Sequence, residues 1–284
     1  MSQRQFIFVI APARSGTGFL AELLRQNLQG AAHVIRARQG WRDPGVHGPD
    51  GAHHMCFGAV GNDTTVRAFW QQKIQRLIRS KASVVAETDP GFARAGLIEN
   101  IAPLTQAGRV DLVVLGRETS PLMWSLMNRL ALHVENARWL TALDPRLPNV
   151  IVDPKPFNAA KVPGQTLWYI HEMRTRAEYY RLLLRGTPNI RLHECSLEQI
   201  TTRDGAGALL AALGHGADDL ALPGPVNTLR HTYFNAGMQA RCEGLVTKFR
   251  VDPVQIAAEY FEAGRRLELG PKQRLSAPPD ARVH

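Results

Sequence analysis

The stretch Phe6-Ile-Phe-Val-Ile-Ala-Pro-Ala-Arg-Ser-Gly-Thr-Gly-Phe-Leu20 predicts a buried strand, a loop of small residues and the start of a helix. Residues 6–10 are all apolar, as in a strand inside a parallel sheet. The loop that follows contains Pro12, Gly16 and Gly18, which interrupt the apolar pattern. Leucines then recur at helical spacing, at positions 20, 23, 24 and 28. The order strand, loop and helix sets the expected architecture at the N-terminus.

A loop of this kind presents several backbone N–H groups at a helix N-terminus, where the helix dipole is positive. Such a site suits phosphate or a similar anion. Glycine allows the backbone to approach the anion without an intervening side chain. Arg14 adds a charged fork, and Ser15 and Thr17 add hydroxyl donors. The stretch therefore predicts an anion site.

The loop differs from the phosphate loop of nucleotide hydrolases, G-x-x-x-x-G-K-[ST]. Ala11 stands at the first glycine of that pattern and Gly16 at the second, and no lysine follows Gly16. The cation lies inside the loop instead, at Arg14. These differences argue against an ATP or GTP hydrolase.

A basic residue followed by Ser-Gly-Thr after a strand resembles the 5′-phosphosulfate loop of sulfotransferases that use 3′-phosphoadenosine 5′-phosphosulfate (PAPS). The resemblance implies that Arg14 stabilises the charge that grows on the bridging oxygen of the leaving 5′-phosphate. It also implies that the backbone of residues 15–18 and the Thr17 hydroxyl hold that phosphate. Phe19 has two interpretations: an aromatic ring that stacks on adenine, or a residue that packs in the core.

Residues 110–115 are the strongest strand signal in the chain, and Arg117 follows them directly. Ser120 as N-cap and Pro121 at the first helical position predict a helix that carries Ser125. This arrangement resembles the segment of the same family in which an arginine and a helix serine hold the 3′-phosphate, and an arginine fork binds phosphate oxygens bidentately. The resemblance thus implies a nucleotide site made of Arg14, Ser15, Gly16, Thr17, Gly18, Phe19, Arg117 and Ser125.

Another strand is predicted at residues 82–86, ending in Glu87-Thr-Asp-Pro90. Open α/β sheets bind ligands beyond the carboxyl ends of their strands, so Glu87 is expected to face the same crevice as the anion loop. The segment is similar to the Glu-Lys-Ser/Thr-Pro segment of carbohydrate sulfotransferases, with Thr88 in place of the lysine. The resemblance implies that Glu87 is the catalytic base, and the alternative is a glutamate that caps the next turn. A histidine from the stretch 31–63, which contains His33, His47, His53 and His54, is the second candidate base.

Strands alternate with helices along the whole chain, which predicts an α/β fold with a central parallel sheet flanked by helices on both faces. The resemblance implies the three-layer, P-loop NTPase-like sulfotransferase fold. We expect a single domain over residues 1–269 and a flexible C-terminal tail over 270–284. Within the domain, residues 31–63 and 139–164 are expected to be irregular and to lie on the acceptor side.

The remaining elements follow from caps and periodicity. Asp63 or Thr64 is expected to cap a helix that reaches Ser80, and the helix after Pro121 is expected to extend to about Arg138. A long helix over 165–185 is expected to bury its aromatic residues and to solvate its charges. A strand at 189–193 and helices at 206–213 and from Asp252-Pro253 complete the prediction.

The chain has 284 residues, is 44% hydrophobic and carries a formal net charge of +9. The basic residues are spread along the chain, so a polyanionic small molecule explains the charge as well as a nucleic acid does. The three cysteines, Cys56, Cys195 and Cys242, show no disulfide or zinc pattern, and the histidines lack a metalloprotease context. Because of these cysteine and histidine patterns, we expect no bound metal. No stretch is long and apolar enough to cross a bilayer, and the apolar run 6–10 is too short for the core of a signal peptide, so we expect a cytoplasmic protein.

These observations favour an enzyme that transfers a sulfuryl group from PAPS to a hydroxyl of a small-molecule or carbohydrate acceptor by in-line displacement, with 3′-phosphoadenosine 5′-phosphate (PAP) as product. One alternative is a Mg²⁺-dependent P-loop kinase or NTPase, in which Asp89 would hold the metal. Another is a non-catalytic protein that binds nucleotides or nucleic acid. The sequence leaves open the acceptor and whether the chain forms a homo-oligomer.

Overall fold

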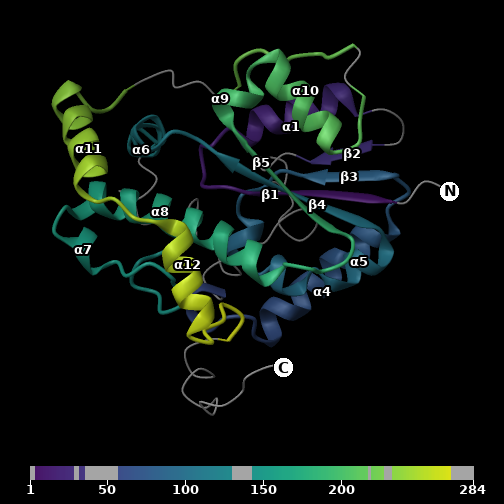
Figure 1. The fold of residues 1–284 in the computed structure, drawn as a ribbon, viewed down its shortest axis with the longest axis horizontal. Coiled ribbons are helices and arrows are strands. Elements are labelled where there is room, and N and C mark those ends of the chain that lie inside the picture. The colour runs from purple at the N-terminus through teal and green to yellow at the C-terminus, as the bar shows by residue number, and fades with distance from the viewer. Residues whose placement is uncertain are drawn as a thin grey trace.

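The computed structural model describes residues 4–28, 32–35, 57–129, 143–216, 219–226 and 232–269. Within these residues, five parallel strands form one sheet in the order β2-β3-β1-β4-β5 (Figure 1). The strands are β1 (Gln5–Ile10), β2 (Ala32–Ile35), β3 (Val84–Glu87), β4 (Arg109–Gly116) and β5 (Ile190–Ser196).

Helices cover both faces of this sheet, which confirms the predicted α/β fold with three layers (Figure 1). One face is covered by α1 (Thr17–Asn27), α9 (Leu197–Ile200) and α10 (Arg203–Ala212). The other face is covered by α4 (Thr64–Arg79), α5 (Ala102–Ala107), α8 (Lys161–Leu183) and α12 (Pro253–Glu262). Further helices are α6 (Thr119–Met127), α7 (Lys155–Asn158) and α11 (Ala236–Lys248), together with the 3₁₀ turns η1 (Phe92–Arg94) and η2 (Ile98–Asn100).

Strand β1 lies at the centre of the sheet, and all six of its residues are buried. Because strand side chains alternate between faces, β1 contributes to both cores. Phe6 and Phe8 pack on the α4 and α8 side, and Ile7 and Val9 pack on the α1 and α10 side. The strand is apolar at every position from 6 to 10 because both of its faces are buried in the folded protein.

The strand order reverses direction at β1, which pairs with β3 on one side and β4 on the other. Ile10 pairs with Val114, so β1 and β4 run side by side to their carboxyl ends. Phe8 pairs with Glu87, the last residue of β3. Ligands in open α/β sheets bind in the crevice at such a reversal point, outside the carboxyl ends of the strands. The turn after β1 therefore lies beside the turn after β4.

Helix α8 departs from the predicted separation of buried aromatic and solvated charged residues. Its aromatic residues are buried as predicted, but Glu172 and Arg176 are also fully buried. Arg176 Nε donates to Glu172 Oε1 over 2.7 Å, and the Glu172 carboxylate also accepts the N–H groups of Ile151 and Val152. The charges are buried because they satisfy each other and the backbone of a neighbouring segment.

Two segments that were expected to be irregular contain regular structure, so those predictions are wrong in part. Residues 31–63 include β2, an edge strand of four residues, and a helical turn at 57–60. Residues 139–164 include α7 and the first turn of α8, in which Pro163 is tolerated because first-turn N–H groups need no helical partner. Of the loop histidines, His33 lies exposed on β2, whereas His47, His53 and His54 lie outside the described residues, as do Cys56 and the tail 270–284.

The helix after β4 is also shorter than predicted. It begins at Thr119, with Glu118 rather than Ser120 at the N-cap, and it ends at Met127 rather than near Arg138. The Asn128 side chain donates to the carbonyl of Trp124 and accepts the N–H of Tyr233. One side chain therefore bonds both a carbonyl in the last turn of α6 and a segment about 100 residues away.

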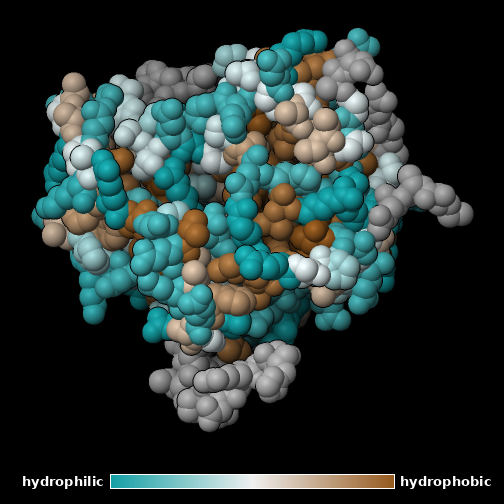
Figure 2. Space-filling model, in the orientation of Figure 1, coloured by the Kyte–Doolittle hydropathy of each residue, from teal (hydrophilic) through white to brown (hydrophobic). Residues whose placement is uncertain are grey.

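The face of the molecule in Figure 2 is mainly hydrophilic, and the hydrophobic residues visible on it lie in separate areas. Exposed large hydrophobic residues include Tyr233 and Val254. Across the described part of the chain, no helix combines the length and the apolar character that a bilayer crossing requires. Cys195 and Cys242 are free thiols.

Candidate functional site

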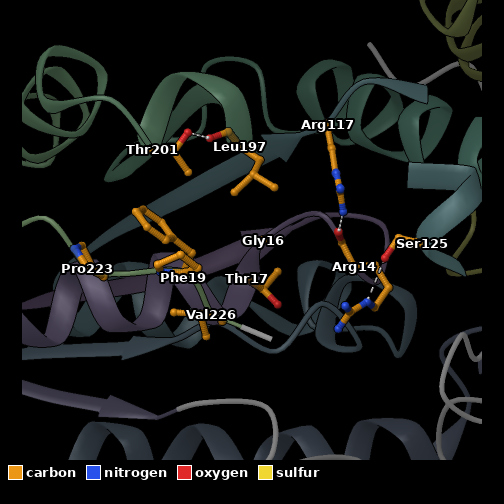
Figure 3. Close-up of a pocket in the computed structure, with 12 residues that line it drawn as sticks. Arg14, Gly16, Thr17, Phe19, Arg117, Ser125, Leu197, Thr201, Pro223 and Val226 are labelled. Carbon is orange, nitrogen blue, oxygen red and sulfur yellow. Dashed lines mark hydrogen bonds between the residues drawn. The ribbon is translucent and has the colours of Figure 1, made fainter. Parts of the chain in front are cut away.

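A pocket of about 590 Å³ lies outside the carboxyl ends of β1 and β4 (Figure 3). Seven of the eight residues predicted to bind a nucleotide line it, and they come from the turns after both strands and from the helices that follow. The lining residues are Arg14, Gly16, Thr17, Gly18, Phe19, Arg117, Ser125, Leu197, Thr201, Pro223, Pro225 and Val226.

The turn between β1 and α1 has an unusual backbone. Arg14 has a φ of 70° and Gly16 has a φ of 93°, both in the left-handed region. Gly16 is the N-cap of α1 and offers no side chain to the first-turn N–H groups. Those N–H groups consequently point out of the helix end without a capping side chain, at the positive end of the helix dipole. This is the geometry of an anion cradle.

The space around Gly16 is also narrow. A Cβ atom at this position would lie 2.4 Å from Leu197 Cδ1, the side chain of another residue that lines the pocket. The close approach of Leu197 and the positive φ together favour glycine at position 16.

Hydrogen bonds join the two turns directly. Arg117 Nη1 donates to the carbonyl of Arg14 over 2.9 Å, and Arg14 Nε donates to Ser125 Oγ over 3.2 Å. Arg117 reaches across from the end of β4, and the Arg14 guanidinium lies beside Ser125 (Figure 3). Two guanidinium groups, a hydroxyl and a helix N-terminus therefore meet at one end of the pocket.

The remaining predicted residue of the loop, Ser15, does not line the pocket. It is fully buried, and its Oγ has no hydrogen-bond partner among the residues that the structure describes. Its backbone N–H donates to the carbonyl of Pro12 over 3.4 Å. Ser15 thus differs from Thr17, which opens α1 and lines the pocket.

The other end of the pocket is mainly apolar, and the sequence analysis missed most of it. Phe19 is 6% exposed; it packs with the α1 core and also lines the pocket near Pro223 and Val226 (Figure 3). Leu197 and Thr201 come from α9 and its end, and the Thr201 hydroxyl donates to the Leu197 carbonyl over 3.0 Å. The Pro223-Gly-Pro225 sequence signals a loop, but nothing local in it indicates contact with the N-terminal turn.

Glu87 lies at the end of β3 but is not among the residues that line the pocket. It is 1% exposed, and Lys73 Nζ of α4 lies 2.7 Å from Oε2 and 3.0 Å from Oε1. Burial raises the pKa of the Glu87 carboxyl above its ordinary value, and the Lys73 ammonium opposes that rise. The sequence did not indicate this partner, and the role of Glu87 as catalytic base stays a prediction.

Asp89 lies two residues after Glu87, and its Oδ1 accepts the N–H of Gly91 over 2.8 Å. Burial raises the pKa of Asp89, while the bond from Gly91 and the charges of Arg94 and Lys73 lower it. Among the described residues, no three His, Cys, Asp or Glu side chains gather as a group that could hold a metal ion.

Arg117 is half-buried, and burial lowers its pKa, while the charge of Glu198 raises it. Because the ordinary pKa of arginine lies far above neutral pH, the group stays cationic. A partly desolvated guanidinium interacts more strongly with an anion than one in bulk water does. The pocket therefore combines a cationic end with an apolar end.

The strained turn generates one prediction. Replacing Gly16 by alanine places a Cβ in the left-handed region and against Leu197, so we expect the free energy of unfolding to fall by about 1–2 kcal/mol. The matched control is Gly244→Ala, since Gly244 is exposed in the middle of α11 with no atom near its Cβ position. There, alanine is expected to raise the free energy of unfolding by up to about 1 kcal/mol. Urea unfolding measures both, and a Gly16→Ala protein as stable as the wild type would contradict the strain.

The buried ion pair between Lys73 and Glu87 generates a second prediction. Lys73→Met leaves the Glu87 carboxylate in the core without its cation, and breaking a buried pair in this way costs about 3–5 kcal/mol. The double replacement of Lys73 by Met and Glu87 by Leu removes both charges and is expected to recover most of that loss. Arg25→Met, which removes the exposed ion pair with Glu22, is the control and should leave stability nearly unchanged. Equal effects of Lys73→Met and Arg25→Met on unfolding by urea would show that the pair is not desolvated.

Comparisons with known proteins add little to this geometry. No family model matches the sequence, and no curated protein matches it. Among solved structures, the chain is similar to a sulfotransferase from Alicyclobacillus acidocaldarius, with a TM-score of 0.47 and 12% sequence identity over 94% of this chain and 98% of that chain. A likeness at this level assigns neither a family nor an activity.

Proposed function

We propose that this protein is a sulfotransferase that binds PAPS and releases PAP. The observation that carries the proposal is that a single pocket is lined by the helix N-terminus after β1, by Arg117 and Ser125 after β4, and by an apolar end around Phe19. A nucleotide with phosphates on both the 5′ and 3′ oxygens of one ribose would satisfy all three features. A nucleotide with a 5′-phosphate alone would leave the second arginine without a phosphate partner.

The N–H groups at the start of α1 and the Thr17 hydroxyl would hold the 5′-phosphate. Arg117 and Ser125 would hold the 3′-phosphate, with charge-assisted hydrogen bonds from the guanidinium. Arg14 lies between the two sets and bonds Ser125, and its guanidinium would turn to the phosphosulfate bridge. Adenine would lie between Phe19 and the wall made by Pro223 and Val226.

In the proposed reaction, the bond between sulfur and the bridging 5′-phosphate oxygen breaks as the acceptor oxygen bonds to sulfur. Both bonding electrons stay with PAP, and the acceptor hydroxyl gives up its proton. Arg14 stabilises the negative charge on the departing oxygen, as cations do in phosphoryl transfer. The scheme takes the acceptor to be a hydroxyl compound of small-molecule or carbohydrate class.

We assign Glu87 as the base that removes the proton from the acceptor hydroxyl. Its place at the carboxyl end of β3, next to β1, supports the assignment, because that is the edge of the sheet at which the pocket lies. The raised pKa of its carboxyl also suits proton transfer, since a base with a pKa nearer the working pH accepts a proton more effectively.

The nucleotide assignment predicts a preference for PAP over adenosine 5′-phosphate (AMP). We expect PAP to bind about 10–100-fold more tightly, because it adds hydrogen bonds between phosphate and the charged Arg117 group. Isothermal titration calorimetry with the two nucleotides measures the ratio. Arg117→Ala should bring the affinity for PAP close to that for AMP.

Arg191→Ala provides the matched control, since Arg191 is an exposed arginine on β5 that does not line the pocket. It should leave the ratio of the two affinities unchanged. If the wild-type protein binds PAP no more tightly than AMP, the assignment of Arg117 and Ser125 to the 3′-phosphate is wrong.

The base assignment predicts a separation of binding from turnover. Glu87→Gln keeps the size of the side chain but leaves the buried Lys73 ammonium without its carboxylate, so the protein is also expected to be less stable. In the folded protein we expect the affinity for PAP to change less than about twofold, while sulfate transfer to an acceptor falls about 10²–10⁴-fold. Lys73→Met, which breaks the same pair and keeps the Glu87 carboxyl, is the control for loss of stability alone. Transfer is measured with radiolabelled PAPS and a panel of phenols, alcohols and sugars. Transfer by Glu87→Gln at a near-normal rate would remove Glu87 as the base and leave the nucleotide site standing.

A further inference from the structure

Helix α8 contacts both anion-binding turns from behind the pocket, although none of its residues is among those that line it. Two of its side chains make these contacts, Tyr169 and Arg174. They are five positions apart, which corresponds to about 7.5 Å along a helix axis. One rigid element therefore touches the turn after β1 and the turn after β4 at two fixed points.

Arg174 holds the turn after β4. Its Nη2 donates to the carbonyl of Arg117 over 2.7 Å, and its Nη1 donates to Thr119 Oγ1 over 2.7 Å. Thr119 is the first residue of α6, the helix that carries Ser125. A planar guanidinium with two parallel donors thus fixes the backbone of Arg117 and the start of the Ser125 helix together.

The charges around Arg174 support this placement. Burial lowers the pKa of Arg174, and the Glu198 carboxylate raises it. The pKa of Arg117 is shifted by the same two effects. Glu198 Oε1 also accepts the backbone N–H of Glu118, between Arg117 and Thr119. The turn after β4 is therefore bonded on one side by a cation and on the other by an anion.

Tyr169 holds the turn after β1. It is fully buried, and its hydroxyl oxygen accepts the backbone N–H of Ala13 over 2.8 Å and Arg94 Nη1 over 2.9 Å. Ala13 immediately precedes Arg14, whose φ lies in the left-handed region. A bond at Ala13 therefore fixes the point at which the chain enters the strained part of the turn.

We propose that Arg174 and Tyr169 are positioning residues, through which α8 sets the distance between the 3′-phosphate and 5′-phosphate arms of the nucleotide site. Because Arg174 and Tyr169 contact different turns, replacing one of them should disturb only the turn that it contacts. Without Arg174, Arg117 and Ser125 lose their common support, and the turn after β1 keeps its own. Without the Tyr169 hydroxyl, the part-buried Ala13 N–H and the buried Arg94 guanidinium each lose an acceptor, and the turn after β4 keeps its bonds to Arg174. The assignment to phosphate arms rests on the proposed function, whereas the bracing of the turns does not.

The first experiment compares PAP and AMP binding to full-length variants by calorimetry. Arg174→Met should weaken PAP binding about tenfold and leave AMP binding within about twofold, because only the 3′-phosphate arm shifts. Tyr169→Phe should weaken both nucleotides by the same factor and so preserve their ratio. Thr119→Val, which deletes one acceptor of Arg174 and keeps the cation, should change the ratio in the direction of Arg174→Met by a smaller factor.

Arg181→Met is the matched control on the same helix, since its guanidinium pairs with Glu178 and Glu194 away from the pocket. It should leave both affinities unchanged. If Arg174→Met weakens PAP and AMP equally, or if both Arg174→Met and Thr119→Val keep the wild-type ratio, Arg174 does not position the 3′-phosphate arm and the proposal is overturned.

The second experiment needs no nucleotide. Amide hydrogen exchange of the ligand-free protein should be faster at residues 117–125 in Arg174→Met and faster at residues 13–19 in Tyr169→Phe, each without change in the other segment. Exchange that is unchanged in both segments, or faster throughout the chain, overturns the proposal. If the wild type does not prefer PAP but the exchange follows this pattern, the proposed function fails and the bracing by α8 stands.

Discussion

The hydrogen bond from the Arg117 side chain to the carbonyl of Arg14 joins the turns that leave the two central strands. The rest of the site depends on this junction. It requires β1 and β4 to be neighbours with their ends aligned, which the pairing of Ile10 with Val114 provides. It also requires the carbonyl of Arg14 to point toward β4, which accompanies the left-handed backbone at Arg14. Sheet order and backbone conformation thus converge on one contact between residues far apart in the sequence.

A consequence is that the groups proposed to bind the anion are held in place by contacts within the protein itself. Arg117 is fixed by its side chain at Arg14 and by its carbonyl at Arg174, so little side-chain freedom remains to be lost on binding. Arg14 bonds Ser125, and a bound anion would replace that contact rather than order a loose side chain. The same principle extends to the core, where the Glu172–Arg176 and Lys73–Glu87 pairs are buried together with their partners. Charges are buried in this fold where hydrogen bonds compensate for the lost water.

Local patterns in the sequence predicted the parts of the fold that depend on local physics. The apolar runs of β1 and β4, the Asp63 cap of α4 and the Asp252 cap of α12 are all signals within a few residues. Strand β2 was missed because four edge residues carry too little periodicity. The sequence of α8 predicts solvated charges, but Glu172 and Arg176 are buried, because they bond each other and residues 149–152 from elsewhere in the chain. The apolar end of the pocket was missed for the same reason, because Leu197 and Val226 meet Phe19 only in the folded protein.

The central claim is that two turns, held at a fixed distance, bind opposite phosphates of one nucleotide. A crystal structure of the protein with PAP bound tests it most directly. The account predicts the 5′-phosphate on the N–H groups that open α1, the 3′-phosphate on Arg117 and Ser125, and the adenine ring beside Phe19. A complex in which the 3′-phosphate contacts neither Arg117 nor Ser125, or in which both phosphates lie on one turn, would contradict it.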